Sequence, residues 1–195
     1  MDIALKEWAV VCDLLLSGEL AILLRKGGIE ESAGPGRFEL RYDRFALFPA
    51  WEHQDPDRIK QQYRDRVEVF DQEPAELTIR GMGAVYPSTI WKVPSRAAFD
   101  QLEDLHCWTK PQIDMRFEYK PDRPLFLMAV RAYTLAQPRT IPCREDYAGC
   151  MSWVPLAEAD EIDVTDAKPV LSDDQFQKIV ERINTTFGPV HDAVE

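Results

Sequence analysis

The segment 125–135 restricts the fold more than any other part of this sequence. Its first half, Leu-Phe-Leu-Met-Ala-Val, is continuously apolar, and its second half, Arg-Ala-Tyr-Thr-Leu, alternates polar and apolar side chains. The first pattern is typical of a strand buried on both faces, and the second of a strand with one exposed face. The segment predicts one long strand that runs from the centre of a sheet toward an exposed end, so the chain must contain further strands.

Five shorter segments are predicted as those strands: residues 20–24, 38–40, 45–48, 76–80 and 115–120. Segments 76–80 and 115–120 alternate with period two, which places one side of each against a core. Pro49 is predicted to end the strand before it, because proline cannot donate a ladder hydrogen bond. Gly81 and Gly83 predict a bulge or a close backbone approach after residue 80.

Four segments are predicted as helices: residues 3–16, 57–68, 95–105 and 172–187. The last has the clearest signals, because Ser172 and Gln175 form a capping box and an apolar stripe of period 3.6 follows them. Pro56 suits the first turn of the second helix, and Ser95 the N-cap of the third. Gly18 suits the left-handed residue that ends the first helix.

These elements predict one α+β domain. We expect a mixed, mainly antiparallel sheet of five to seven strands, packed by an N-terminal, a middle and a C-terminal helix. The sheet is expected in a barrel-like form, with an open α/β sandwich as the alternative. A chain of 195 residues with 45% hydrophobic residues suits one core of this size.

The charge of the chain argues against an unspecific nucleic-acid or membrane binder. It carries 34 acidic and 23 basic residues, for a formal charge of -11. No segment has the roughly 18 apolar residues of a membrane span, and no signal peptide is recognisable, so a cytoplasmic location is expected. The four cysteines lie far apart without a C-x-x-C pair, which predicts free thiols and makes a zinc site improbable.

Two segments carry residues suited to chemistry, and the first follows the buried strand 20–24. Lys26, Gly27 and Gly28 combine a cation with backbone N–H groups that can approach an anion closely. They are predicted to bind a phosphate, and the alternative is a tight turn with solvated charges.

The second segment contains Glu52, His53 and Gln54. A turn here would let Glu52 and His53 face one site, where the imidazole could act as a general base or hold a ligand together with Gln54. The alternative is a structural histidine that caps loop carbonyls. Glu31, four residues after Gly27, is a third candidate catalytic carboxylate.

Cationic and aromatic side chains interleave from Trp108 to Tyr133. Such interleaving is found on surfaces that stack single-stranded nucleic acid. In the predicted strand 115–120, however, Met115, Phe117 and Tyr119 form one apolar face, so packing in the core is the preferred interpretation.

Four sequence motifs resemble a known family. They are A-L-K-E-W-A-V (residues 4–10), L-L-R-K-G-G-I (23–29), L-F-P-A-W-E-H-Q (47–54) and G-C-M-S-W (149–153). Together they are similar to the bacterial and cyanobacterial proteins of the domain of unknown function 1802. The resemblance implies a family-like core over residues 1–156. The residue pattern adds an acidic connection (157–170) and the C-terminal helix (171–188) to the same single domain. It implies no activity.

The sequence leaves three functional hypotheses. The first is a binding module for a phosphate-bearing small molecule or nucleic acid, with Lys26, Gly27, Gly28, His53 and Gln54 at its site. The second is a metal-assisted hydrolase or nuclease in which Glu31, Glu52 and His53 supply acid, base or metal contacts. The third is a protein-interaction domain that docks through the acidic segment 158–174. The Walker, zinc-protease, nucleophile-elbow and dinucleotide signatures are absent, so the sequence specifies no cofactor.

Overall fold

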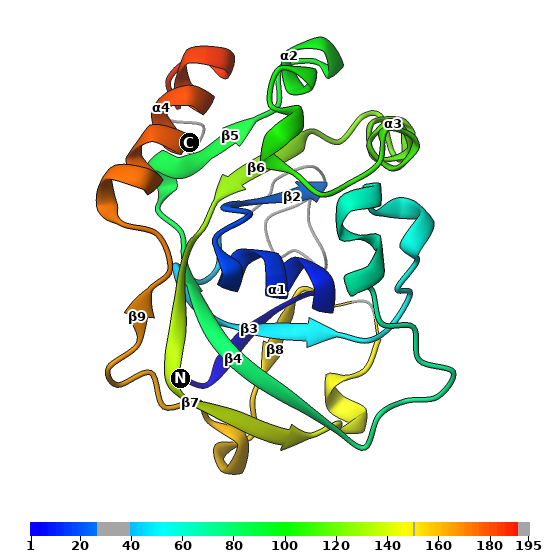
Figure 1. Ribbon diagram of the computed structural model, residues 1–195, viewed down its shortest axis with the longest axis vertical. Coiled ribbons are helices and arrows are strands. Elements are labelled where there is room, and N and C mark those ends of the chain that lie inside the picture. The colour runs from blue at the N-terminus through cyan, green and yellow to red at the C-terminus, as the bar shows by residue number, and fades with distance from the viewer. Residues whose placement is uncertain (27–39, 150, 191–195) are drawn as a thin grey trace.

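The protein contains two β-sheets, and helix α1 (Ala9–Ser17) lies between them (Figure 1). The computed structural model describes residues 1–26, 40–149 and 151–190. The larger sheet has the strand order β8 (Trp153–Pro155), β1 (Ile3–Trp8), β3 (Arg44–Ala50), β4 (Glu76–Ala84), β7 (Arg131–Pro142) and β9 (Lys168–Pro169). The smaller sheet has the order β2 (Ile22–Lys26), β6 (Leu125–Ala129) and β5 (Ile90–Lys92).

The topology confirms the predicted α+β class. Strands β1 and β3 run parallel, and the other strand pairs in the described part of the chain are antiparallel. The larger sheet does not close into a barrel, since β8 and β9 form its two ends. Side chains alternate between two cores, with Leu5 and Phe45 on one face of this sheet and Ala4 and Phe48 on the other.

The segment 125–135 forms two strands rather than the single strand predicted. Strand β6 pairs with β2 and β5 in the smaller sheet, whereas β7 pairs with β4 in the larger one. Val130 lies between them and donates its backbone N–H to the carbonyl of Ala21 (2.8 Å). The change from a continuously apolar pattern to an alternating one thus marks the point where the chain passes from one sheet to the other.

The predicted N-terminal helix begins six residues late. Residues Ile3–Trp8 form β1, and helix α1 occupies Ala9–Ser17 before it ends at Gly18, which has the expected left-handed conformation (φ 78°). Strand β1 pairs with β3 and β8 and is buried on both faces, so it carries apolar residues on both sides. Pairing with these distant strands overrides the helical spacing of its apolar residues.

Two further predictions on secondary structure are wrong. Residues Lys110–Glu118 form helix α3 where a strand was predicted, and Pro111 lies in its first turn. The predicted helix 57–68 is replaced by two short 3₁₀ segments, Pro56–Arg58 and Gln61–Arg66. The predicted strand 38–40 lies largely outside the described residues.

The proline at position 49 does not end its strand. Strand β3 continues to Ala50, where Pro49 lies opposite Glu7 of β1. The neighbour on the other side, β4, pairs only with residues 44–46 of β3 in the described structure. Pro49 therefore lies where no ladder hydrogen bond is needed on that side, as proline in a sheet requires.

The glycine prediction is confirmed by a register shift between Ile79 and Gly81, where β4 pairs with β7. A Cβ atom at Gly81 would lie 2.7 Å from the carbonyl oxygen of Tyr133 and would also clash with Leu16 of α1. The absence of a side chain thus lets α1 pack directly on the larger sheet.

Two of the predicted helices lie beside the smaller sheet (Figure 1), although the predicted helix 95–105 ends at Asp100 and continues only as a 3₁₀ turn at Glu103–Leu105. Helix α2 (Arg96–Asp100) is capped by Ser95, which accepts from the N–H of Ala98. Helix α4 (Asp173–Phe187) begins with the predicted capping box of Ser172 and Gln175. Its buried stripe consists of Phe176, Val180 and Ile183.

We expect the C-terminal helix to contribute strongly to stability. Replacing the fully buried Ile183 by alanine should lower the free energy of unfolding by about 2–5 kcal/mol. Ile179 is only partly buried on the same helix and is the matched control, so Ile179→Ala should lower the free energy of unfolding less. Loss of the N-cap in Ser172→Ala should cost ~0.5–2 kcal/mol. Urea unfolding would measure all three, and equal, negligible effects of the two isoleucines would show that α4 is not part of the core.

Candidate anion-binding site

Strand β1 ends with two buried, oppositely charged residues, Lys6 and Glu7. As neighbours on a strand they point to opposite faces of the larger sheet. Each is paired on its own face: the Lys6 ammonium with Glu52 (2.8 Å), and the Glu7 carboxylate with Arg25 (2.6 Å). Pairing is required, because a buried charge without a partner costs far more than an exposed one.

Glu52 lies in the predicted turn after β3. Its Oε1 atom accepts from Lys6 and from the backbone N–H of Gly149 (3.3 Å), and Lys6 also donates to the Gly149 carbonyl (3.0 Å). The other carboxylate oxygen, Oε2, is buried without a hydrogen-bond partner among the described residues. Glu52 thus joins the turn to β1 and to the segment before β8.

His53 and Gln54 have different surroundings. His53 is exposed and adopts a left-handed backbone conformation (φ 58°), which is uncommon for a residue with a side chain. Gln54 is buried and donates to the carbonyls of Ala50 (2.9 Å) and Glu52 (3.3 Å). The residue that caps loop carbonyls is therefore Gln54 and not His53, and a ligand-binding role for His53 stays a prediction.

Of the residues that follow the buried segment 20–24, Arg25 rather than Lys26 contacts β1. Arg25 pairs with Glu7 and also donates to the carbonyl of Lys6 (3.3 Å). Lys26 donates to the carbonyl of Phe117 (2.9 Å) in the last turn of α3, and burial lowers its pKa. The structure does not bring Lys26 to Glu52, whose partner is Lys6. Gly27, Gly28 and Glu31 lie outside the described residues.

A second arginine, Arg116 of α3, lies close to the same carboxylate. Burial is the main cause that lowers the pKa of Arg116, while Glu7 raises it and Arg25 lowers it further. Its guanidinium group lies over the ring of Trp108 (4.7 Å), which contacts Trp8 edge to face (5.0 Å). Aromatic stacking thus holds Arg116 in place.

We call Glu7, Arg25 and Arg116 the guanidinium site. Arg25 pairs directly with the Glu7 carboxylate, and the charge of Glu7 also acts on Arg116. The Nε atoms of Arg25 and Arg116 are buried and have no hydrogen-bond partner among the described residues. Among those residues the site thus holds two guanidinium groups and one carboxylate, with unused donors that an anion would complete.

The sequence contains signals for this site, but it does not show that they belong together. Arg25 adjoins the predicted anion-binding residue Lys26, and Arg116 lies in the stretch where cations and aromatics interleave. Glu7 occurs in the first family motif. Because Arg116 was placed on a strand and Glu7 on a helix, nothing in the sequence indicated that the two meet.

The cysteines near the site are not suited to nucleophilic chemistry. Cys12 and Cys107 are buried free thiols, and burial, supported by the charge of Glu7, raises the pKa of both, that of Cys107 to about 12. Cys143 is also free, and Cys150 lies outside the described residues. Within the described ranges, no group of three histidine, cysteine or acidic side chains could hold a metal ion.

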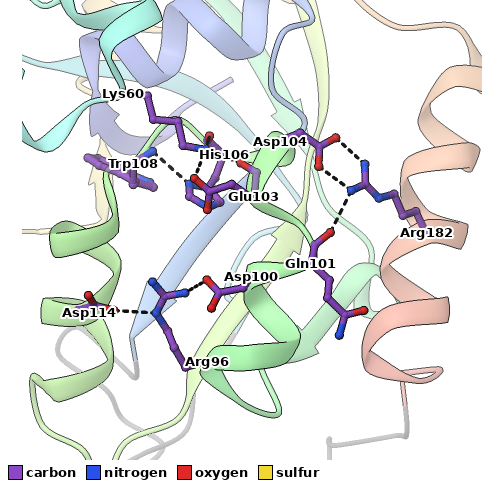
Figure 2. Close-up of polar contacts among 10 residues, drawn as sticks. All are labelled: Lys60, Arg96, Asp100, Gln101, Glu103, Asp104, His106, Trp108, Asp114 and Arg182. Atoms are coloured by element: carbon purple, nitrogen blue, oxygen red, sulfur yellow. Dashed lines mark hydrogen bonds and ion pairs between the residues drawn. The ribbon is translucent and has the colours of Figure 1, made fainter.

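A network of polar contacts around His106 holds the backbone of Trp108 in place (Figure 2). The Nδ1 atom of the buried His106 accepts from the N–H of Trp108 (3.2 Å). Lys60 donates to the carbonyls of Glu103 and His106 and pairs with the Glu103 carboxylate (3.1 Å). Arg182 of α4 donates to Asp104 from both terminal nitrogens, so the network links the C-terminal helix to the segment beside the guanidinium site.

A surface groove of about 370 Å³ lies elsewhere, between α1 and the strands β3 and β4. Its lining includes Asp13, Trp51 and Phe70, but neither Arg25 nor Arg116. The groove is therefore separate from the guanidinium site.

The acidic segment 158–174 is partly internal. Asp160 is buried and accepts hydrogen bonds from Arg144 and from the hydroxyl of Tyr147 (2.7 Å). Strand β9 pairs with β7. A docking role for its exposed acids stays a prediction.

In the part of the chain that the structure describes, no helix is long and apolar enough to cross a membrane.

Fold and site together define a two-sheet α+β protein with a cationic centre between β1, β2 and α3. The chain belongs to the family described as domain of unknown function (DUF1802), whose model matches residues 4–182, and this confirms the resemblance seen in the motifs. No curated protein matches it.

Two solved structures are similar, both of an ASCH protein from Zymomonas mobilis. The first has 11% sequence identity and a TM-score of 0.44, and the match covers 92% of this chain and 93% of that one. The second, a single-substitution variant, also has 11% identity, with a TM-score of 0.41 over 92% and 94% of the two chains.

The network predicts a pH dependence of stability centred on His106. Burial and the charge of Lys60 lower the pKa of His106 to about 4, against the opposing effect of Glu103. Between that value and its ordinary pKa of about 6.5, the unfolded chain binds a proton that the folded protein does not. Stability should therefore be full above pH 6.5 and fall by roughly 1–3 kcal/mol as the pH drops to 4.

Urea unfolding of the parent and of His106→Asn at pH 7 and pH 4.5 would test this, because asparagine retains an acceptor but does not titrate. The variant should lose less stability on acidification than the parent does. The exposed His53, replaced by asparagine, is the control and should leave the pH dependence as it is. The same acid sensitivity in all three proteins would rule out His106 as its source.

Proposed function

We propose that this protein is a binding module for a phosphate-bearing ligand, a nucleotide or a part of a nucleic acid, and that the guanidinium site receives the phosphate. The observation that carries the proposal is the pair of buried Nε donors of Arg25 and Arg116, neither of which has a hydrogen-bond partner among the described residues. Buried donors without partners cost stability, and such costs are typical of functional sites.

The chemistry of the site favours phosphate as the anion. Each guanidinium group presents several N–H donors in a planar fork that matches the oxygens of a phosphate. Lys26 adds a third cation where β2 approaches the end of α3. The protein as a whole carries a charge of -11, so an anion is attracted only by such a local concentration of cations.

The described contacts favour binding over hydrolysis. Glu52, the carboxylate expected to act as acid, base or metal ligand, is engaged by Lys6 and by the backbone of Gly149. Its arrangement supports a structural role at the end of β1. A hydrolase that uses Glu31, Glu52 and His53 therefore remains the alternative hypothesis.

Arg116→Gln should weaken the binding of a nucleoside monophosphate roughly tenfold or more, because it removes a charged hydrogen-bond donor from the phosphate. Its stability should be unchanged or slightly higher, since a buried cation in excess is removed. Isothermal titration calorimetry with adenosine, guanosine, cytidine and uridine monophosphates, and with the matching nucleosides, would measure the effect.

Lys110→Gln is the matched control, because it removes one positive charge from the exposed face of the same helix. It should bind as the parent protein does. Equal affinity of the parent and Arg116→Gln, or equal losses in both variants, would contradict the proposal.

A further inference from the structure

Helix α3 exposes the apolar side chains that its sequence suggested would be buried. Met115 and Tyr119 are 40% and 54% exposed, and they lie four residues apart at the C-terminal end of the helix. The expectation of core packing depended on a strand with these residues on one inner face. In a helix these two lie on the same outer side, so the expectation is wrong for them, whereas Phe117 does pack against the core. The exposure of Met115 and Tyr119 needs another explanation.

Cations surround this exposed end. The Lys120 ammonium lies over the ring of Tyr119 (5.0 Å), and Lys26 donates to the Phe117 carbonyl. Lys120 has a left-handed backbone conformation (φ 45°) where the chain leaves the helix. The negative end of the helix dipole favours both cations here. We call Lys26, Tyr119 and Lys120 the stacking patch.

The stacking patch continues the guanidinium site. Lys26, which follows Arg25 on β2, donates to the carbonyl of Phe117, the residue after Arg116. Arg116 and Tyr119 are three residues apart, about 4.5 Å along the axis of α3. Asp114 and Glu118 are the acids on this helix, and Asp114 is held by Arg96 (2.8 Å). The cationic surface therefore extends from the buried arginines to an exposed aromatic ring.

We infer that the phosphate-bearing ligand is a single-stranded nucleic acid, with one phosphate in the guanidinium site and a neighbouring base stacked on Tyr119. This inference rests on the proposed function. An exposed aromatic ring flanked by ammonium groups is the arrangement that binds single strands without reading their sequence. In a duplex the bases stack on one another and cannot reach such a ring.

Fluorescence anisotropy with a labelled eight-nucleotide RNA, the DNA of the same sequence and the duplex of each would test the inference. The parent should bind single strands more tightly than the duplexes and more tightly than adenosine monophosphate. Tyr119→Ala should weaken single-strand binding about tenfold and leave the affinity for the monophosphate unchanged. RNA and DNA affinities then show which nucleic acid is preferred.

Tyr86→Ala is the control, because Tyr86 is 50% exposed and precedes β5, outside the stacking patch. It should bind single strands as the parent does. If Tyr119→Ala also binds them as the parent does while Arg116→Gln is impaired, the inference is overturned and the proposed function stands. Equal binding of single strands and duplexes would overturn it as well. If Arg116→Gln binds every probe as the parent does, the proposed function itself fails.

Discussion

The ion pair between Glu7 and Arg25 connects the two sheets of this protein. Glu7 lies at the end of β1 in the larger sheet and Arg25 at the end of β2 in the smaller one, and both side chains are almost fully removed from water. Neither charge can be buried alone, so the sheets must approach closely enough for the pair to form. Arg116, held by stacking on Trp108, adds a second guanidinium group, whose pKa burial lowers and the charge of Glu7 raises.

Local signals in the sequence predicted those elements whose ends are set by their own residues. The capping box of Ser172 and Gln175 and the left-handed Gly18 both occur where they were expected, because each satisfies backbone groups within one turn. Segments whose structure depends on distant partners were assigned wrongly. Strand β1 has helical spacing but is held between β3 and β8, and the alternating residues of α3 read as a strand.

The candidate site was predicted in its chemistry but not in its members. The expectation of a cationic anion site after residue 24 is retained in the proposal, with Arg25 beside Lys26. Arg116 comes from a helix 91 residues further along the chain, and sequence pattern alone cannot show that the charges of Glu7 and Arg25 act on it. The same holds for the pairing of Lys6 with Glu52, which are 46 residues apart.

The position of β1 also has a consequence for the order of folding. Its two neighbours, β3 and β8, come from residues 44–50 and 153–155, so one edge of β1 has no partner until most of the chain has been synthesised. Contacts between such distant segments form slowly and leave a strand edge open to other chains in the meantime. Lys6 and Glu7 lie on this strand, and charged side chains on a strand with an open edge discourage pairing with a foreign strand. We therefore expect the residues that organise the finished site also to oppose aggregation of the nascent chain.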